Sequence, residues 1–444
     1  MSEIIIAGAG HGGVVAAVKL AEAGHKVTVF EKEPKNLLGL PQSDIVEKAA
    51  FDYAEIPLPP DAKPVRNQMT FVPLGDDVSR ITLPASERES VSVDRKKLIR
   101  HLLSCAENAG AEIVYGTEIT APVVLGNRVC GIKTNKGDFF GDLVIDSCGV
   151  FSPVRSALPE YMCVNRKIGK YDVLHTYRAY FDKKPDVPDP ETTYNVYLRD
   201  DGTVGFSWLV TEKDRVDALV GRFHSIDDAE ALRVLRKIHD ENPHMGTELV
   251  NGGSFKCIPV CQPLAVLVAN GYAAVGDSAF MTYSAKGSGI AYSLRAGTML
   301  ADCVLNDTRG FYDAEHLWEY QKRFFKEIGF SACRIAVAKN LLHYMTAAQL
   351  SDLLKQNIIT TEEVAKVMEE KVDAILNAKG FSTVKEKVRL IRDNPILKEM
   401  ITNVAVWMGR FTVTESSFPN KYDEEDVEKW NERYNSFFAS IEAP

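Results

Sequence analysis

Several features that mark other protein classes are missing from this sequence. No stretch approaches the roughly 18 uninterrupted apolar residues of a membrane-spanning helix, so we expect any membrane contact to be made from the surface. Lysine and arginine form no basic cluster and the net charge is −9, so no nucleic-acid partner is expected. The eight cysteines include no Cys-x-x-Cys pair, so we expect no metal site.

The composition is that of a soluble globular protein. Hydrophobic residues make up 45% of the chain and charged residues 25%, and 444 residues are enough for two or three structural units. Scattered cysteines in a sequence that starts without a secretory leader are typical of a reducing compartment. We therefore expect a cytoplasmic protein, with any membrane contact peripheral.

The first 32 residues carry the most informative pattern. Ile4–Ile6 predicts a buried parallel strand, residues 14–23 predict a helix, and Lys26–Phe30 predicts a second strand. Between the first strand and the helix lies the turn Gly-Ala-Gly-His-Gly-Gly at 8–13, which satisfies GxGxxG. This order of strand, glycine turn, helix, strand and acid predicts a dinucleotide-binding site.

Each part of the pattern has a physical role. The first glycine permits the tight turn, the second lets the backbone approach a pyrophosphate, and the third lets the helix pack closely on the strand. The helix N-terminus then offers free N–H groups to the phosphates. Glu31 is placed to accept hydrogen bonds from an adenosine ribose, and a carboxylate there favours NAD or FAD over NADP. The predicted contacts at this end are Gly8, Gly10, His11, Gly12, Gly13, Glu31 and Lys32.

A second segment, 250 residues downstream, favours FAD. Residues 267–276 predict a strand, and Asp277 follows directly at its end. Gly289-Ile290 predicts the start of a helix. The Asp277 carboxylate is placed to accept a hydrogen bond from a ribityl hydroxyl. The N–H groups of Gly289 and Ile290, at the positive end of a helix, are placed to stabilise negative charge on a reduced isoalloxazine.

This second segment resembles one protein family. Gly-Asp-Ser-Ala at 276–279, followed by Lys-Gly-Ser-Gly-Ile at 286–290, is similar to the second FAD motif of the geranylgeranyl reductases. That family shares its fold with the aromatic hydroxylase flavoproteins. The resemblance implies a FAD cofactor, bound in this segment by Gly276, Asp277, Gly287, Gly289 and Ile290.

Three weaker segments extend the resemblance over most of residues 1–330. The helix that begins at Arg95 is similar to the family helix whose arginine contacts FAD, and Gly116–Ile119 is similar to the strand whose backbone brackets the adenine, which implies FAD contacts by Arg95 and Ile119. Residues 141–155 resemble the family's DADG-x-x-S-x-V-R segment, except that Cys148 replaces its usual aspartate. We expect a packed thiol at Cys148, with a redox-active thiol as the alternative.

The residues between the FAD segments alternate as β-strands do. Residues 175–181, 193–198 and 203–210 predict antiparallel strands, joined by residues 68–72 and 80–83, that cover the isoalloxazine. Gly-Phe-Ser-Trp at 205–208 resembles the reductase family's substrate-facing GYxWxFP segment, which implies substrate contacts by Phe206 and Trp208. The alternative is that both are ordinary sheet core.

The predicted fold is α/β. It has a Rossmann-like FAD-binding domain of the glutathione-reductase type, an interleaved antiparallel β-sheet substrate domain and a helical C-terminal region. The predicted FAD domain comprises residues 1–60, 88–165 and 256–305. The substrate domain comprises residues 61–87 and 166–255, and the helical region comprises residues 306–444.

The resemblance predicts a FAD-dependent oxidoreductase that reduces carbon–carbon double bonds of an apolar, isoprenoid-like substrate. The proton donor is not identified by the sequence; the candidates are Tyr283, Lys286, His175 and Tyr177. The alternatives are a flavin-dependent monooxygenase acting on a compact aromatic substrate, an electron-transfer flavoprotein that reduces a quinone, and a non-catalytic flavin-binding protein. An external electron donor, reduced nicotinamide or ferredoxin-like, is expected, and the oligomeric state is left open.

Overall fold

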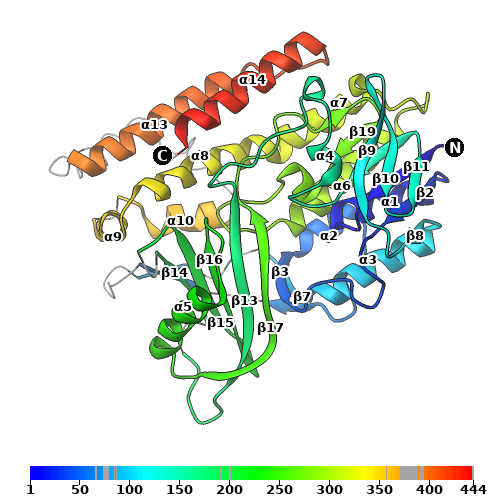
Figure 1. Ribbon diagram of the computed structural model, residues 1–444. Helices are drawn as coiled ribbons and strands as arrows, with labels where there is room; N and C mark the ends of the chain where they lie inside the picture. The colour runs from blue at the N-terminus through cyan, green and yellow to red at the C-terminus, as the bar shows by residue number, and fades with distance from the viewer. Residues whose placement is uncertain are drawn as a thin grey trace.

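The computed structural model describes residues 1–65, 68–73, 80–84, 86, 88–190, 193–199, 202–356, 358–370, 389 and 395–442. Figure 1 shows three parts: a parallel sheet with its helices next to the N-terminus, a long twisted sheet in the middle of the chain, and a set of C-terminal helices that runs across the top of both. No described helix is both long enough and apolar enough to cross a membrane.

The six-stranded sheet has the order β18-β19-β12-β1-β2-β8 and is parallel except for its β18–β19 edge. Its strands are β1 (Glu3–Ala7), β2 (Lys26–Phe30), β8 (Glu112–Val114), β12 (Leu143–Asp146), β18 (Val268–Ala269) and β19 (Tyr272–Ala274). The single strand expected over residues 267–276 is wrong. Two short antiparallel strands form instead, because the chain turns at Gly271, whose φ is +71°.

Helices and a small sheet flank this parallel sheet. Helix α1 (His11–Glu22) packs against both α3 (Arg95–Ala109) and α6 (Ile290–Leu305). The small antiparallel sheet consists of β9 (Ile119–Leu125), β10 (Arg128–Thr134) and β11 (Gly137–Phe140). Residues 116–118, expected within a strand, link β8 to β9. Short helices complete this part: α2 (Lys48–Ala54), α4 (Pro153–Ser156), η2 (Glu160–Met162) and η3 (Gly276–Ala279).

The second large sheet has the order β17-β13-β16-β15-β14-β5-β6. Its strands are β5 (Met69–Pro73), β6 (Ile81–Thr82), β13 (Val173–Lys183), β14 (Tyr194–Leu198), β15 (Gly205–Thr211), β16 (Arg215–Arg222) and β17 (Met245–Pro259). All pairs are antiparallel except β14 with β5, which the sequence did not predict. Helix α5 (Asp228–Glu241) packs on one face of this sheet, which leaves the other face to line a cavity.

A fourth sheet, of three strands, contacts both large parts: Arg178 and Tyr180 of β13 bond to its Ser43 and Asp44, and β3 packs on α6. It consists of β3 (Ser43–Glu47), β4 (Lys63–Val65) and β7 (Ser90–Asp94). The described strands that form the seven-stranded sheet come from residues 69–82 and 173–259. The domain boundaries given above remain a prediction.

The helices that follow residue 313 pack partly on the parallel-sheet part, through buried aromatic side chains, and partly on the seven-stranded sheet. They are α7 (Ala314–Phe324), the π-helical η4 (Phe325–Gly329), α8 (Phe330–Tyr344), α9 (Ala347–Lys355), α10 (Thr361–Met368), α13 (Pro395–Glu415) and α14 (Glu424–Ile441). Within this set Trp430 donates from Nε1 to the carbonyl of Ala265 at 2.8 Å, and Tyr434 donates to that of Pro263 at 2.8 Å. These bonds attach α14, the last helix, to the segment that precedes β18.

A fully buried carboxylate connects the segments of the nucleotide-binding part. Asp146, at the end of β12, has no exposed surface. It accepts hydrogen bonds from the hydroxyls of Ser152 at 2.5 Å, Tyr272 at 2.8 Å and Ser278 at 3.0 Å, and from the amides of Cys148 at 3.0 Å and Arg155 at 3.2 Å. One side chain therefore joins the loop after β12 to β19 and to the Gly276–Ala279 turn.

We expect Asp146→Asn to lower the free energy of unfolding by about 3 kcal/mol, because an amide cannot accept all of these donors and places its own NH₂ against them. Urea denaturation followed by circular dichroism measures the change. Asp138→Asn is the control, because that carboxylate is exposed on β11. Equal midpoints for the two variants would contradict the structural role given to Asp146.

Candidate functional site

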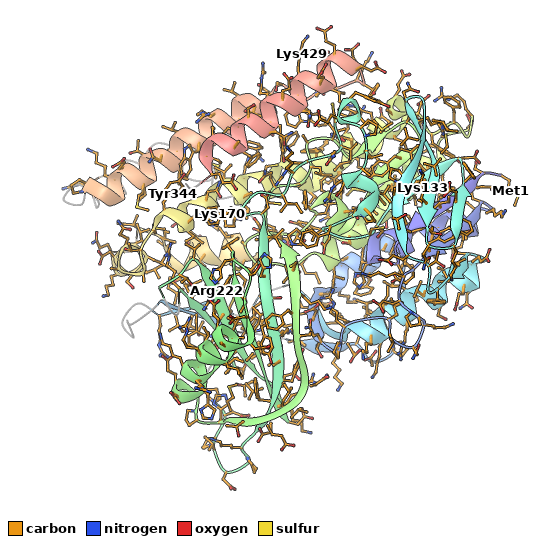
Figure 2. All side chains as sticks on the ribbon, in the orientation of Figure 1. Met1, Lys133, Lys170, Arg222, Tyr344 and Lys429 are labelled. Atoms are coloured by element: carbon orange, nitrogen blue, oxygen red, sulfur yellow. The ribbon has the colours of Figure 1, made fainter. Side chains whose placement is uncertain are left out.

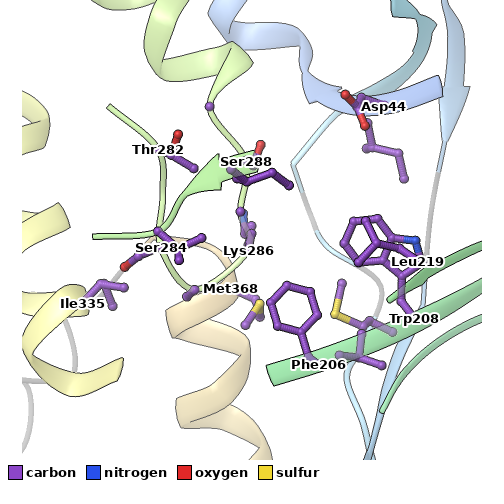
Figure 3. A pocket seen from close by; sticks show the side chains of 18 of the residues that line it. Asp44, Phe206, Trp208, Leu219, Thr282, Ser284, Lys286, Ser288, Ile335 and Met368 are labelled. Carbon is purple, nitrogen blue, oxygen red and sulfur yellow. The ribbon is translucent and has the colours of Figure 1, made fainter. Parts of the chain in front are cut away.

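A cavity of about 1320 Å³ lies between the parallel-sheet part, the open face of the seven-stranded sheet and helices α8 to α10. This volume exceeds the roughly 300–1,000 Å³ of a typical small-molecule pocket, so it has room for a dinucleotide and a second ligand together. Figure 3 shows side chains of the second glycine segment on one side of this cavity and Phe206 and Trp208 on the other.

The glycine turn forms one end of the cavity. Gly10, His11 and Gly12 line it, whereas Gly8 and Gly13 lie behind them. A Cβ on Gly10 would meet Ser147 Oγ at 2.2 Å, and one on Gly13 would meet Ser147 Cβ at 2.6 Å. Gly8 has φ +83°, a conformation that favours glycine. The turn therefore packs on the loop after β12 with no space for side chains.

The two glycine segments, far apart in sequence, lie against each other. A Cβ on Gly12 would meet Val275 Cγ2 at 2.7 Å, and one on Gly297 in α6 would meet the Gly12 carbonyl oxygen at 2.2 Å. Asp277 lines the cavity and accepts a hydrogen bond from Thr282 Oγ1 at 3.1 Å. Burial raises the pKa of its carboxyl group, and Thr282 opposes this effect.

Two helices begin at the wall of this cavity. The first residues of α1 and α6 line it, and neither helix has a side-chain N-cap or an acidic residue in its first turn. Their free N–H groups and positive helix ends favour negative charge. A dinucleotide with an anionic pyrophosphate and a flavin that becomes anionic on reduction fits this arrangement.

The other residues predicted for the adenine half are placed differently. Glu31 is buried, and its carboxylate accepts from the amides of Ala9 at 3.0 Å and Glu33 at 2.8 Å, so it holds the glycine turn. Lys32 is exposed, and none of Glu31, Lys32 and Ile119 is among the residues that line the cavity. Arg95 does line it and pairs with Asp44 at 3.4 Å. FAD contacts by these residues remain predictions.

Sequence reasoning missed a charged group on the cavity wall, which neighbours both His11 and Trp208, whose ring centroid lies 5.4 Å from Arg178. Arg178 donates to Asp217 at 2.6 Å, to Asp44 at 2.9 Å and to the carbonyl of Ser43 at 2.6 Å, and all four residues line the cavity. Burial lowers the pKa of neighbouring His11 to about 3, so this imidazole is neutral. Residue spacing gave no signal for this group, because its members come from β3, β13 and β16.

Of the proton-donor candidates, Lys286 alone lines the cavity among the described residues. Its ammonium lies 3.8 Å from Glu47 and 3.7 Å from Glu370. Tyr283 is fully buried and donates to the Val367 carbonyl at 2.5 Å. His175 and Tyr177 occupy the other face of β13, where Tyr177 packs with the α5 cluster. The structure therefore does not bring Tyr283, His175 or Tyr177 to the cavity.

The opposite arm of the cavity is apolar and aromatic. Phe206 and Trp208 both line it, and their rings stack with centroids 6.0 Å apart. The same arm is closed by further apolar side chains from the sheet and from α9 and α10: Met69, Phe71, Ile81, Leu83, Val196, Leu198, Leu354, Val364 and Met368. A hydrocarbon chain or an aromatic ring would be shielded from water there.

Cys148 lies beside the glycine turn at the cavity wall. Burial raises the pKa of its thiol well above the ordinary value, and the neighbouring Asp146 raises it further. The thiol is therefore protonated at neutral pH, which favours a packing role over a redox role. All eight cysteines lie in the described residues and are free. The described residues hold no group of metal-binding side chains.

Comparison with known proteins finds similar sequences. Residues 6–53 match the NAD(P)-binding Rossmann-like domain family. Digeranylgeranylglycerophospholipid reductase of Sulfolobus acidocaldarius is 22% identical over 380 residues, 83% of both chains. The protein of that name from Methanosphaerula palustris is 27% identical over 414 residues, 89% of this chain and 96% of that one.

Solved structures share the fold. A geranylgeranyl bacteriochlorophyll reductase-like protein from Thermoplasma acidophilum superposes with a TM-score of 0.70 at 20% identity, covering 88% of this chain and 99% of that one. The resemblance to geranylgeranyl reductases is confirmed. A probable FAD-dependent monooxygenase from Pseudomonas aeruginosa superposes with a TM-score of 0.57 at 19% identity, covering 83% and 99%. The predicted flavoprotein fold is confirmed as well, and it is common to both kinds of enzyme.

We expect Gly10→Ala to yield protein without bound flavin, because the added methyl group collides with Ser147 and displaces the turn. Visible absorbance of the purified protein measures flavin content. Gly409→Ala is the matched control, since nothing lies within 4 Å of a Cβ at that helical position. A yellow Gly10→Ala protein with wild-type flavin content would contradict the assignment of this turn.

Proposed function

We propose that this protein is a FAD-dependent oxidoreductase that reduces carbon–carbon double bonds of an apolar, isoprenoid-like substrate. The observation that carries the proposal is the continuity of the cavity, which joins two uncapped helix N-termini to an aromatic, apolar arm. Relatives that cover most of the chain are named as reductases of a digeranylgeranyl lipid, which supports the same reaction class.

The residues at the flavin end have distinct tasks. The turn at 8–13 and Glu31 would hold the adenosine and pyrophosphate, and Asp277, with the N-terminus of α6, would hold the ribityl chain and the isoalloxazine. Reduced FAD supplies a hydride from its N5 atom. This assignment keeps residues 1–60, 88–165 and 256–305 as the FAD domain, with the sheet residues 61–87 and 166–255 as the substrate domain and 306–444 as the helical region.

The protein must also deliver a proton to the second alkene carbon. Figure 3 shows Lys286 between Ser288 of the second glycine segment and Phe206 of the apolar arm, and its ammonium pairs with Glu47 at 3.8 Å and Glu370 at 3.7 Å. Burial raises the pKa of Glu370. Lys286 would donate the proton and recover it through these carboxyl groups, while the surrounding apolar side chains exclude water.

Monooxygenation is the second candidate, favoured by the structural similarity to the Pseudomonas aeruginosa protein. Rapid mixing of the reduced protein with oxygen distinguishes the two, because accumulation of a peroxyflavin absorbance supports the monooxygenase.

The remaining parts of the proposal concern partners and location. An external donor, reduced nicotinamide or a ferredoxin-like protein, would reduce the flavin, since the sequence contains no second GxGxxG. We place the protein in the cytoplasm, in peripheral contact with the membrane that contains its lipid substrate.

Purified protein reduced with dithionite is expected to saturate double bonds of a geranylgeranyl compound, detected by mass spectrometry as the gain of two hydrogens for each bond. The control reaction omits the protein. Unchanged substrate beside fully reduced flavin would overturn the proposed reaction.

Lys286→Met is expected to slow alkene reduction about 100-fold, the usual contribution of a positioned acid. Flavin content and the rate of flavin reduction by dithionite should stay at wild-type values, which separates proton delivery from cofactor binding. Lys322→Met serves as the control, because that lysine pairs with Glu319 on the surface of α7. Equal turnover of the two variants would remove Lys286 from the mechanism.

A further inference from the structure

At the end of the cavity next to α8, two cations have no carboxylate partner among the described residues. Lys339 and Arg199 both line the cavity, and neither forms an ion pair with a described carboxylate. Lys339 donates to the carbonyl oxygens of Val260 and, at 3.4 Å, of Tyr171. Arg199 donates to the carbonyl of Leu342 at 3.0 Å, near the C-terminus of α8. Backbone carbonyls satisfy these donors without neutralising the charges.

These charges are partly removed from water. Burial lowers the pKa of Lys339 to about 8 and lowers that of Arg199. The carboxylates whose fields reach Lys339 are those of Asp172 and Glu442, and Asp172 is engaged by Arg166. A buried cation is costly unless an anion accompanies it, so this end of the cavity favours a negatively charged ligand.

Aromatic rings surround the two cations. The His343 ring lies 4.4 Å from Tyr171 and 4.7 Å from Phe223, between ring centroids, and Lys339 Nζ lies 5.4 Å from the Phe223 centroid. Figure 2 labels Lys170, Arg222 and Tyr344, which are the sequence neighbours of Tyr171, Phe223 and His343. His343 is only 9% exposed, lines the cavity, and its Nδ1 has no hydrogen-bond partner among the described residues.

Apolar side chains continue from this point into the rest of the cavity. Ile335 and Leu342 of α8, Met345 at its end and Leu350 of α9 also line it. A ligand that extends through this space meets a positive charge at one end and hydrocarbon along its length. The arrangement fits an amphiphile with an anionic head.

We propose that Lys339, Arg199 and His343 bind an anionic phosphate-type group at the polar end of the substrate while its chain lies in the apolar arm. This inference rests on the proposed function for the identity of the chain. The same three side chains would also bind free phosphate. The experiment distinguishes a phosphate group on the substrate from free phosphate.

Binding without turnover tests the proposal. Geranylgeranyl phosphate, geranylgeraniol and inorganic phosphate are titrated by calorimetry into oxidised, FAD-loaded protein. In the wild type, the phosphate ester is expected to bind more tightly than the alcohol. Lys339→Met should weaken binding of the ester about tenfold, which corresponds to the loss of one charge-assisted hydrogen bond. The affinity for the alcohol should change less than twofold. Lys339→Arg should restore binding of the ester.

A surface-lysine variant and a second cavity variant serve as controls for the binding test. Lys421→Met, which removes an exposed lysine, should bind all three ligands as the wild type does. Arg199→Gln repeats the test if Lys339→Met does not fold. If Lys339→Met loses affinity equally for the ester and the alcohol, or loses affinity for neither, the proposed head-group site is overturned. Inorganic phosphate that binds as tightly as the ester would also overturn it, since the site would then recognise a free anion. The titrations measure binding and not turnover. Their outcome therefore does not depend on whether the protein reduces alkenes, and the two proposals can fail separately.

Discussion

The nucleotide-binding half of this protein depends on the buried carboxylate of Asp146. Its hydrogen bonds hold the loop after β12, the edge strand β19 and the Gly276–Ala279 turn in one fixed arrangement. Ser147, the next residue, is the surface on which the glycine turn packs and accepts from the Gly13 amide at 3.2 Å. Both halves of the cofactor cradle are thus positioned from one strand end, where a charged acceptor without its donors would be costly to bury.

This arrangement explains why two helices can begin at the same cavity. Glycines at their contact let α1 and α6 approach until a Cβ on Gly297 would lie 2.2 Å from the Gly12 carbonyl. Arg178 then ties the seven-stranded sheet to β3 through Asp44, so the apolar arm is held in register with the flavin end. An enzyme that transfers hydride needs such a fixed distance between cofactor and substrate.

Much of the site could be predicted because its signals are local. The glycine turn and Asp277 were found from short patterns, and the structure brings them together. Phe206 and Trp208 share a face of β15 because they are two residues apart, as strand geometry requires. The proton-donor candidates His175 and Tyr177 lie on the face of β13 away from the cavity, and by the same alternation Thr176 and Arg178 lie on the cavity side.

By itself, the sequence determined the opening order of strand, glycine turn, helix and strand, the glycines that this turn requires and the kind of cofactor it suits. These properties depend on backbone geometry within a few residues. Only the tertiary structure decided which charges meet. Glu47, Lys286 and Glu370 come from three separate segments, and Arg199 reaches α8 from the sheet. These contacts depend on how whole helices and strands pack. Ion pairs and hydrogen bonds form between groups that are close in space, whatever their separation along the chain.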